Sequence, residues 1–93
     1  MENLKVEFNE ELSQFEMDLD GEKALIGFKK EKDGTLNLVH TEVPPKYEGK
    51  GVGSQLVKQT LEQIKMTDKK IVPSCPFIAA YIKRHPEYES LVK

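Results

Sequence analysis

The stretch HTEVPPKYEGKGVGSQLVKQTLEQIK, residues 40–65, holds in one run the end of a strand, a bend, a glycine-rich turn and a whole helix. Pro44 and Pro45 have no backbone N–H to donate, so a strand that reaches them must end there. After the glycines, apolar residues recur at helical spacing and polar residues fill the positions between them. The sequence therefore predicts a strand that ends near residue 43 and a long amphipathic helix that begins at the glycines.

The glycine-rich turn, with Gly49, Gly51 and Gly53 at alternate positions, is a candidate phosphate site. Glycine lets the backbone approach a ligand closely, and the first-turn N–H groups of a helix have no partners within that helix. A Walker loop is excluded because Ser54 and Gln55 follow the last glycine, where that loop requires Lys followed by Ser or Thr. The dinucleotide fingerprint requires a third Gly or Ala at position 54, and the RNA-binding GxxG loop also fails to match. The alternative is that the glycines only turn the chain between strand and helix.

The string EGKGVG, residues 48–53, resembles the Gln/Arg-x-x-Gly-x-Gly/Ala pyrophosphate loop of the GCN5-related N-acetyltransferases. Together with VPSCPFIAAYIKRHPEY, residues 72–88, it resembles the small, single-domain YjdJ-type members of that family, and the resemblance covers nearly the whole chain. One departure is Glu48, an anion where the family has Gln or Arg. The resemblance implies acetyl-CoA as acyl donor and an amine as acceptor. It also implies that the pyrophosphate is bound by backbone N–H groups of Lys50, Gly51, Val52, Gly53 and Ser54, while Val43 offers backbone groups to the pantetheine arm.

Composition describes an ordinary globular chain. With 93 residues, 32% charged and 38% hydrophobic, it is expected to form one domain, residues 1–93. A formal net charge of −2 gives no reason to expect nucleic-acid binding, and no apolar run approaches the roughly 20 residues of a membrane span. The N-terminal residues do not have a signal-peptide pattern, and a single cysteine fits a reducing cytoplasm. Two histidines and one cysteine are too few to predict a metal site.

The patterns along the chain predict strands at residues 4–9, 14–20, 22–30 and 35–43, with turns at Asp20-Gly21 and Asp33-Gly34. Strict alternation in the last of these strands puts Leu36, Leu38, His40 and Glu42 on one face, and apolar residues on both faces predict a strand that is covered on both sides. After the long helix, the sequence predicts a short parallel strand at 70–73 and a second helix from Pro76 to about residue 84.

The predicted fold class is therefore α/β in an α+β arrangement. An antiparallel meander is followed by helix, strand and helix, which resembles a minimal acetyltransferase fold. The segment at residues 9–13 is too short to hold the N-terminal helices of the larger family members. The acceptor side is accordingly expected to be open.

His40 and Cys75 are the candidate catalytic residues. His40 titrates near neutrality and precedes the glycine turn, and Cys75 ends the next parallel strand, so both are expected to face one cleft. Cys75 should cap the second helix, whose positive end stabilises a thiolate. In the resembling small family, a histidine and a cysteine at these places are the suspected active-site pair. The alternative is that both are ordinary core residues, and the acetyl group could pass through Cys75 or go directly to an amine that His40 deprotonates.

Three hypotheses about function follow from the sequence. The first is an acetyl-CoA-dependent N-acetyltransferase that acts on an unidentified amine. A non-catalytic acyl-CoA-binding module would keep the loop without a productive acceptor site. A protein-interaction domain would use the glycines only to turn the chain.

Overall fold

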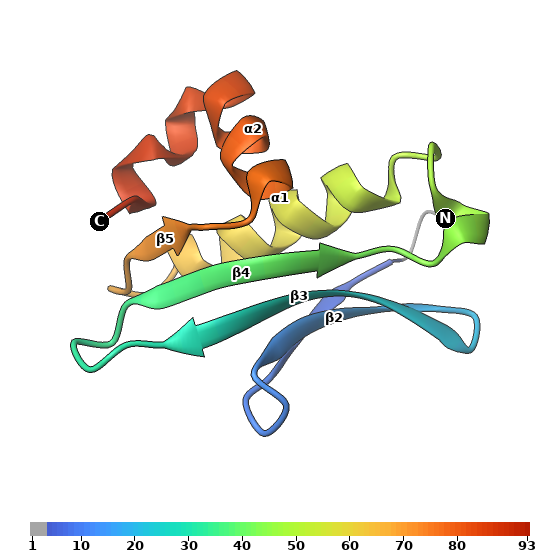
Figure 1. Ribbon diagram of the computed structural model, residues 1–93, viewed down its shortest axis with the longest axis horizontal. Coiled ribbons are helices and arrows are strands. Elements are labelled where there is room, and N and C mark those ends of the chain that lie inside the picture. Colours follow the sequence, from blue (N-terminus) through green and yellow to red (C-terminus); the bar gives the residue numbers. More distant parts are fainter. Residues whose placement is uncertain (1–3) are drawn as a thin grey trace.

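A five-stranded mixed sheet forms the centre of the computed structural model, which describes residues 4–93 (Figure 1). The strands are β1 (Val6–Asn9), β2 (Gln14–Leu19), β3 (Glu22–Lys30), β4 (Leu36–Glu42) and β5 (Ile71–Pro73), and they lie in the order of the chain. Neighbours from β1 to β4 are antiparallel, and β4 pairs with β5 in parallel. This is the predicted meander followed by a crossover, and each predicted strand is present within a residue or two of its expected ends.

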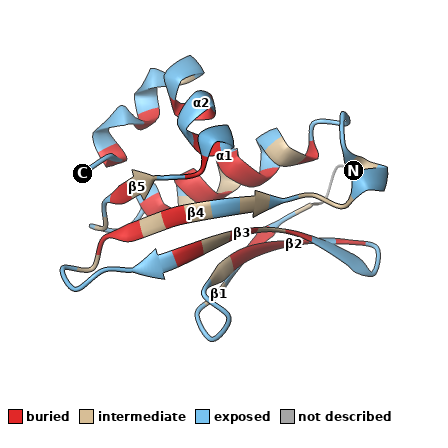
Figure 2. Ribbon diagram, viewed as in Figure 1, coloured by how far each residue is buried: buried red, intermediate tan, exposed pale blue. Residues whose placement is uncertain are grey.

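Two helices supply the rest of the hydrophobic core. The long helix α1 (Val52–Lys65) crosses from β4 to β5 and contacts β1, β2 and β3, and α2 (Pro76–Arg84) contacts β4, β5 and α1. Short 3₁₀ turns, η1 (Pro45–Tyr47) and η2 (Pro86–Leu91), precede α1 and follow α2. The sheet thus has a helix face, against which α1 and α2 pack, and an open face. The prediction that β4 is covered on both sides was wrong, because Asn37 and Val39, on either side of the buried Leu38, are only half-buried. Figure 2 shows buried and partly exposed segments alternating along β4.

A β-bulge in β4 changes which residues share a face. Phe28 of β3 pairs with Leu38, and the next residue, Gly27, pairs with His40, so Val39 is an extra residue in β4. Side chains alternate between faces along a strand, and one extra residue reverses the alternation beyond it. Thr41 therefore joins Leu38 on the helix face, whereas His40 points to the open face. The expectation that Leu36, Leu38, His40 and Glu42 share one face was wrong for this reason.

Several backbone groups at the two outer edges of the sheet are bonded to other parts of the chain. On the β1 side, Gln59 of α1 accepts from the Val6 N–H (3.0 Å) and donates to the Leu4 carbonyl (2.8 Å). One turn later on α1, Gln63 donates to the Val6 carbonyl (2.5 Å). On the β5 side, Ile71 forms a parallel bridge with Val92, and its carbonyl accepts from the N–H of Lys93 (2.9 Å).

The C-terminal turn η2 is held against α1 by Tyr88. This side chain is buried, and its hydroxyl donates to Glu62 Oε2 at 2.6 Å. Burial, and then the hydrogen bond to Glu62, raise the pKa of the Tyr88 hydroxyl above its ordinary value. Tyr88 and Leu91 are therefore buried against the rest of the fold, whereas Val92 is exposed.

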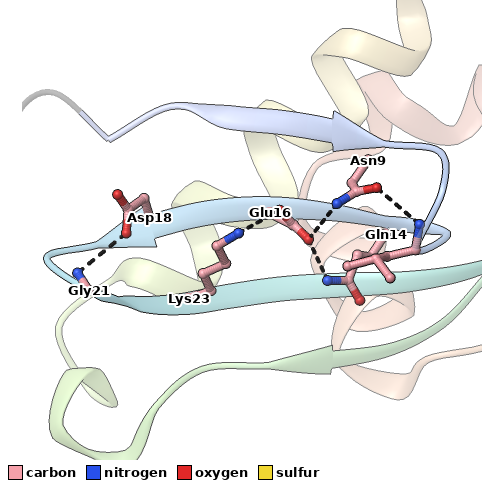
Figure 3. A network of polar contacts seen from close by, with 7 residues as sticks. Asn9, Gln14, Glu16, Asp18, Gly21 and Lys23 are labelled. Carbon is pink, nitrogen blue, oxygen red and sulfur yellow. Dashed lines mark hydrogen bonds and ion pairs between the residues drawn. The ribbon is translucent and has the colours of Figure 1, made fainter.

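A polar network occupies the β1–β2–β3 part of the open face (Figure 3). The buried carboxylate of Glu16 accepts hydrogen bonds from Gln14 (2.5 Å), Lys23 (3.0 Å) and Asn9 (3.1 Å). These bonds, that from Gln14 first and that from Lys23 next, lower the pKa of Glu16. The negative charge of Glu16 is thus balanced locally by the ammonium group of Lys23.

Within residues 4–93, no helix is long and apolar enough to cross a membrane.

Candidate functional site

A cleft of about 380 Å³ opens beside the C-terminal half of β4. Its walls come from β4, from the turn that leads into α1, and from the first residues of α1 and α2. The lining residues are Thr41, Val43, Tyr47, Glu48, Gly49, Gly51, Gly53, Ser54 and Phe77. Residues 41–54 therefore form one cleft with the start of α2, which lies more than twenty residues later in the chain.

The cleft exists because β5 separates from β4. The two strands pair only along Leu36–Leu38, and the last backbone bond between these segments runs from the Cys75 N–H to the Leu38 carbonyl (2.9 Å). β4 itself continues to Glu42, so its last residues have no partner strand on this side. Since Thr41 and Val43 continue the face of Leu38 after the bulge, their backbone N–H and C=O groups point to the edge that β5 has left.

The three glycines of the turn serve different purposes. Gly49 (φ 76°) and Gly51 (φ 81°) adopt left-handed backbone conformations that side chains disfavour. Gly53 lies within α1, and a Cβ there would come 3.0 Å from Phe77 Cζ and 3.7 Å from Val43 Cγ2. The first two glycines therefore shape the turn, and the third allows the Phe77 ring of α2 to lie close against the start of α1.

The start of α1 presents backbone donors to the cleft. Gly51 is the N-cap and makes no side-chain capping bond, and the first helical bond runs from the Gln55 N–H to the Gly51 carbonyl (3.1 Å). The N–H groups of Val52, Gly53 and Ser54 precede that bond, so they have no partners in the helix ladder. Such a helix end attracts anions. Among the residues that line the cleft, Glu48 is the one that carries a negative charge.

Cys75 lies behind Thr41. It is the N-cap of α2, as predicted, and it is 6% exposed, with Sγ 3.3 Å from Thr41 Oγ1. The Cys75 thiol thus contacts Thr41, and Thr41 is the residue of the two that lines the cleft.

His40 is on the other side of the sheet. Its Nε2 lies 2.9 Å from Glu42 Oε2, and the two side chains are 53% and 64% exposed. Because His40 and Thr41 are neighbours on opposite faces of β4, the prediction that His40 and Cys75 face one cleft was wrong. The bulge at Val39 is the physical reason, and the residue that contacts Cys75 is Thr41.

Among the predicted binding residues, the structure brings Val43, Gly51, Gly53 and Ser54 together in the lining of the cleft. The Val52 side chain is buried in the core, so only its backbone N–H faces the helix end, and Lys50 is exposed beside the turn.

Sequence reasoning missed Thr41, Tyr47 and Phe77 as cleft residues. The Tyr47 hydroxyl donates to the Leu19 carbonyl (3.1 Å), which ties the turn to β2. Phe77 is 42% exposed, and its ring lies against Gly53. Its position directly after Pro76, on the first turn of a helix, was the available signal.

Residues 4–93 contain no group of three His, Cys, Asp or Glu side chains arranged to hold a metal ion.

Comparisons with known proteins agree with this geometry. The family model described as GCN5-related N-acetyl-transferase matches residues 14–91. Protein NATD1 of Danio rerio is 32% identical over 89 residues, covering 91% of this chain and 81% of that protein. Protein NATD1 of Homo sapiens is 31% identical, with 89% and 75% covered. The solution structure of a GCN5-like protein from Staphylococcus aureus aligns with a TM-score of 0.72 at 26% identity, covering 100% of this chain and 91% of that one.

Proposed function

Because the chain belongs to the GCN5-related N-acetyltransferase family, we propose that it binds acetyl-CoA in the cleft and transfers the acetyl group to an amine. The observation that carries the proposal is the separation of β4 from β5 directly beside an uncapped helix N-terminus. An extended ligand with amide groups and a diphosphate requires these two features side by side.

The residues of the cleft fit each part of the donor. The N–H groups of residues 50–54 would bind the diphosphate, and the exposed Lys50 lies beside them. The backbone groups of Thr41 and Val43 would bind the amides of the pantetheine arm as a neighbouring strand would. Gly53 supports this fit, because a Cβ there would displace Phe77, which lines the cleft with Val43.

Acetyl-CoA, when bound, supplies an activated acyl thioester. The protein must then hold the thioester and remove a proton from the attacking amine. We assign Cys75, with Thr41, to the donor side and His40 to the acceptor side. This division favours direct attack by the amine over transfer through Cys75, because the thiol has no contact with His40 that could activate it.

The location of the donor can be tested by NMR. On addition of acetyl-CoA, amide chemical-shift changes are expected to concentrate in residues 41–54 and 72–77, which surround the cleft. ATP and NADH serve as controls, since both carry phosphates on adenosine and lack the pantetheine arm. Changes confined to the hairpins at 14–34 would contradict this location, and an equal response to ATP would leave only general anion binding at the helix end.

The route of transfer can be tested by intact mass. After mixing with acetyl-CoA we expect no acetyl group to remain on the protein, because the Cys75 thiol contacts Thr41 and not a base. Cys75→Ser is expected to lower the transfer rate by about tenfold, the effect of losing a single modest contact in the transition state. A retained acetyl group that disappears in Cys75→Ser and forms more slowly in His40→Ala would instead establish a two-step route through the thiol.

Two alternatives remain to be separated from the proposal. A non-catalytic acyl-CoA-binding module would bind acetyl-CoA and CoA without transfer to any amine. A protein-interaction domain would bind neither, so calorimetry with acetyl-CoA, CoA, ATP and NADH removes it first.

A further inference from the structure

A second hollow lies at the opposite end of α1 from the cleft. Its volume is about 200 Å³, and its walls come from the last turn of α1, from the loop before β5, and from strand ends of the sheet. The lining residues are Phe8, Glu10, Phe15, Lys30, Leu36, Gln63, Ile64, Thr67 and Lys69. None of these residues lines the cleft. This α1-end pocket is therefore a separate candidate site.

Aromatic rings form one side of the α1-end pocket. The rings of Phe8 and Phe15 both line it, with their centroids 5.1 Å apart. Phe28 packs against both of them, at 5.7 and 5.6 Å between centroids, and so fixes their positions. Phe8 is nevertheless 47% exposed, whereas Phe15 is buried. Because aromatic rings attract one another in offset and edge-on contacts, this surface favours a ligand that contains an aromatic ring.

The opposite side of the pocket is held in place by hydrogen bonds. The Thr67 hydroxyl donates to the Ile64 carbonyl (2.6 Å) and accepts from the N–H of Lys69 (3.1 Å). The N–H of Leu36 donates to the Lys70 carbonyl (2.9 Å), which fixes the loop against β4. The pocket is thus formed before any ligand binds. An apolar cavity of about 150 Å³ holds a benzene molecule, so a pocket of about 200 Å³ holds one ring with a short side chain.

Three charged residues line the α1-end pocket, and one of them has no partner of opposite charge within residues 4–93. Lys30 Nζ lies 3.3 Å from Glu10 Oε2, so these two charges offset each other. Lys69 is half-buried, and among the described residues it takes part in no ion pair. Its ammonium lies over the β3–β4 turn, where a Cβ on Gly34 would be 3.8 Å from Nζ. The pocket therefore carries an unpaired positive charge beside its apolar surface.

The C-terminal end of α1, which carries a partial negative charge, is bonded within the chain. The carbonyls of Gln63 and Ile64 accept from the N–H groups of Met66 and Thr67, at 3.2 and 2.9 Å. These carbonyls are therefore less available to a cation. Phenylalanine rings also attract cations, but the ammonium of Lys69 would repel one here. The charges at this end of the molecule thus favour an anionic ligand.

We infer that the α1-end pocket binds a small aromatic carboxylate, with its ring against Phe8 and Phe15 and its carboxylate on the ammonium of Lys69. A carboxylate would give Lys69 the ion pair that residues 4–93 do not provide, and the ring would cover the exposed face of Phe8. The inference is independent of the proposed function, because this pocket shares no lining residue with the cleft. It gives the chain a second ligand site, at the far end of the helix that starts at the cleft.

Amide chemical shifts recorded during a titration with 3-phenylpropionate test the site. Shifts are expected at Phe8, Lys30, Leu36, Thr67 and Lys69, with a dissociation constant of about 1 mM, as suits a ligand of this size. The neutral 3-phenylpropanamide should bind about fivefold more weakly, and the cationic 3-phenylpropylamine more weakly still. Equal affinities for the three probes, no shift at all, or shifts confined to residues 41–54 would overturn the inference.

Two lysine variants separate a specific ion pair from a general attraction of anions. Lys69→Met removes the ammonium and should weaken binding of 3-phenylpropionate about fivefold while leaving that of 3-phenylpropanamide unchanged. Lys70→Met is the matched control, because Lys70 is the next residue, does not line this pocket and donates to the Ser90 carbonyl (2.7 Å). An equal loss in both variants would place the anion in the neighbouring polar hollow that Lys70 lines, and the inference would be wrong.

The aromatic part of the site is tested by Phe8→Ser, which should weaken binding of 3-phenylpropionate and of 3-phenylpropanamide alike, by about fivefold or more. Circular dichroism checks that this variant is folded, and Lys69→Met keeps the test decisive if it is not. Dilution of the ligand-free protein should leave the amide shifts of the pocket residues unchanged. Shifts that change on dilution would show that a second copy of the chain covers the pocket. That result, or unchanged affinity in a folded Phe8→Ser, contradicts the assignment.

Discussion

In a Gly53→Val variant, affinity for acetyl-CoA is expected to fall by about a hundredfold or more, which corresponds to about 2.7 kcal/mol, while the protein remains folded. The first atom of the new side chain would lie 3.0 Å from Phe77 Cζ and 3.3 Å from Cε2, and the valine methyl groups would extend further into the space between α1 and α2. Phe77 is 42% exposed, so its ring can move outward and the fold can survive. The methyl groups would still cover the first-turn N–H groups of α1, which are proposed to donate hydrogen bonds to the diphosphate of acetyl-CoA.

Lys65→Val is the matched control for this change. Lys65 is exposed at the C-terminal end of α1, so valine there introduces the same β-branched side chain into the helix at the end opposite the cleft. Calorimetry should give a wild-type dissociation constant for this control, and circular dichroism should show both variants folded. Wild-type affinity in Gly53→Val would mean that the phosphates bind elsewhere.

Ile78→Ala is expected to destabilise the protein by about 3 kcal/mol, the usual cost of removing a large buried aliphatic side chain. Ile78 is fully buried in α2, the helix that carries Phe77 and Cys75 at its start and packs on β4, β5 and α1. For a chain of this size, the Tm should fall by roughly 15 °C. Since α2 forms one wall of the cleft, acetyl-CoA affinity should fall as well.

A graded series separates loss of packing from a general disturbance of α2. Ile78→Val should cost about 1 kcal/mol, and Met66→Ala, at a residue that is 89% exposed, should leave the Tm nearly unchanged. Thermal unfolding followed by circular dichroism measures all three variants. A loss in Ile78→Ala no larger than that in Met66→Ala would contradict the packing of α2 described above.

Local chemistry made most of the fold predictable. The turn at Asp20-Gly21 is a two-residue hairpin in which both residues have positive φ, as an Asp-Gly pair favours. The start of α2 at Pro76 and the start of α1 after Gly51 depend on the backbone preferences of single residues. Such preferences are visible in one sequence.

The candidate site was less predictable because it depends on register between distant segments. The extra residue at Val39 has no signature in the local pattern of β4, yet it moves His40 to one face and Thr41 to the other. Phe77 belongs to the cleft only because α2 packs beside α1, which periodicity within α2 cannot reveal. Sequence reasoning therefore predicted the glycine-rich turn at the start of α1 but assigned His40 to the wrong side of the sheet.

The distribution of backbone bonds at the margins of the sheet bears on self-association. An exposed strand edge invites another chain to add a strand, the usual route to aggregation. Gln59 and Gln63 occupy the outer edge of β1, and the C-terminal residues Val92 and Lys93 occupy that of β5. The stretch from Thr41 to Val43, which β5 leaves unpaired, is a short strand edge that lines the cleft. A ligand that fills it would complete the sheet, so saturating the protein with acetyl-CoA should protect the amides of Thr41 and Val43 from hydrogen exchange as an added strand would.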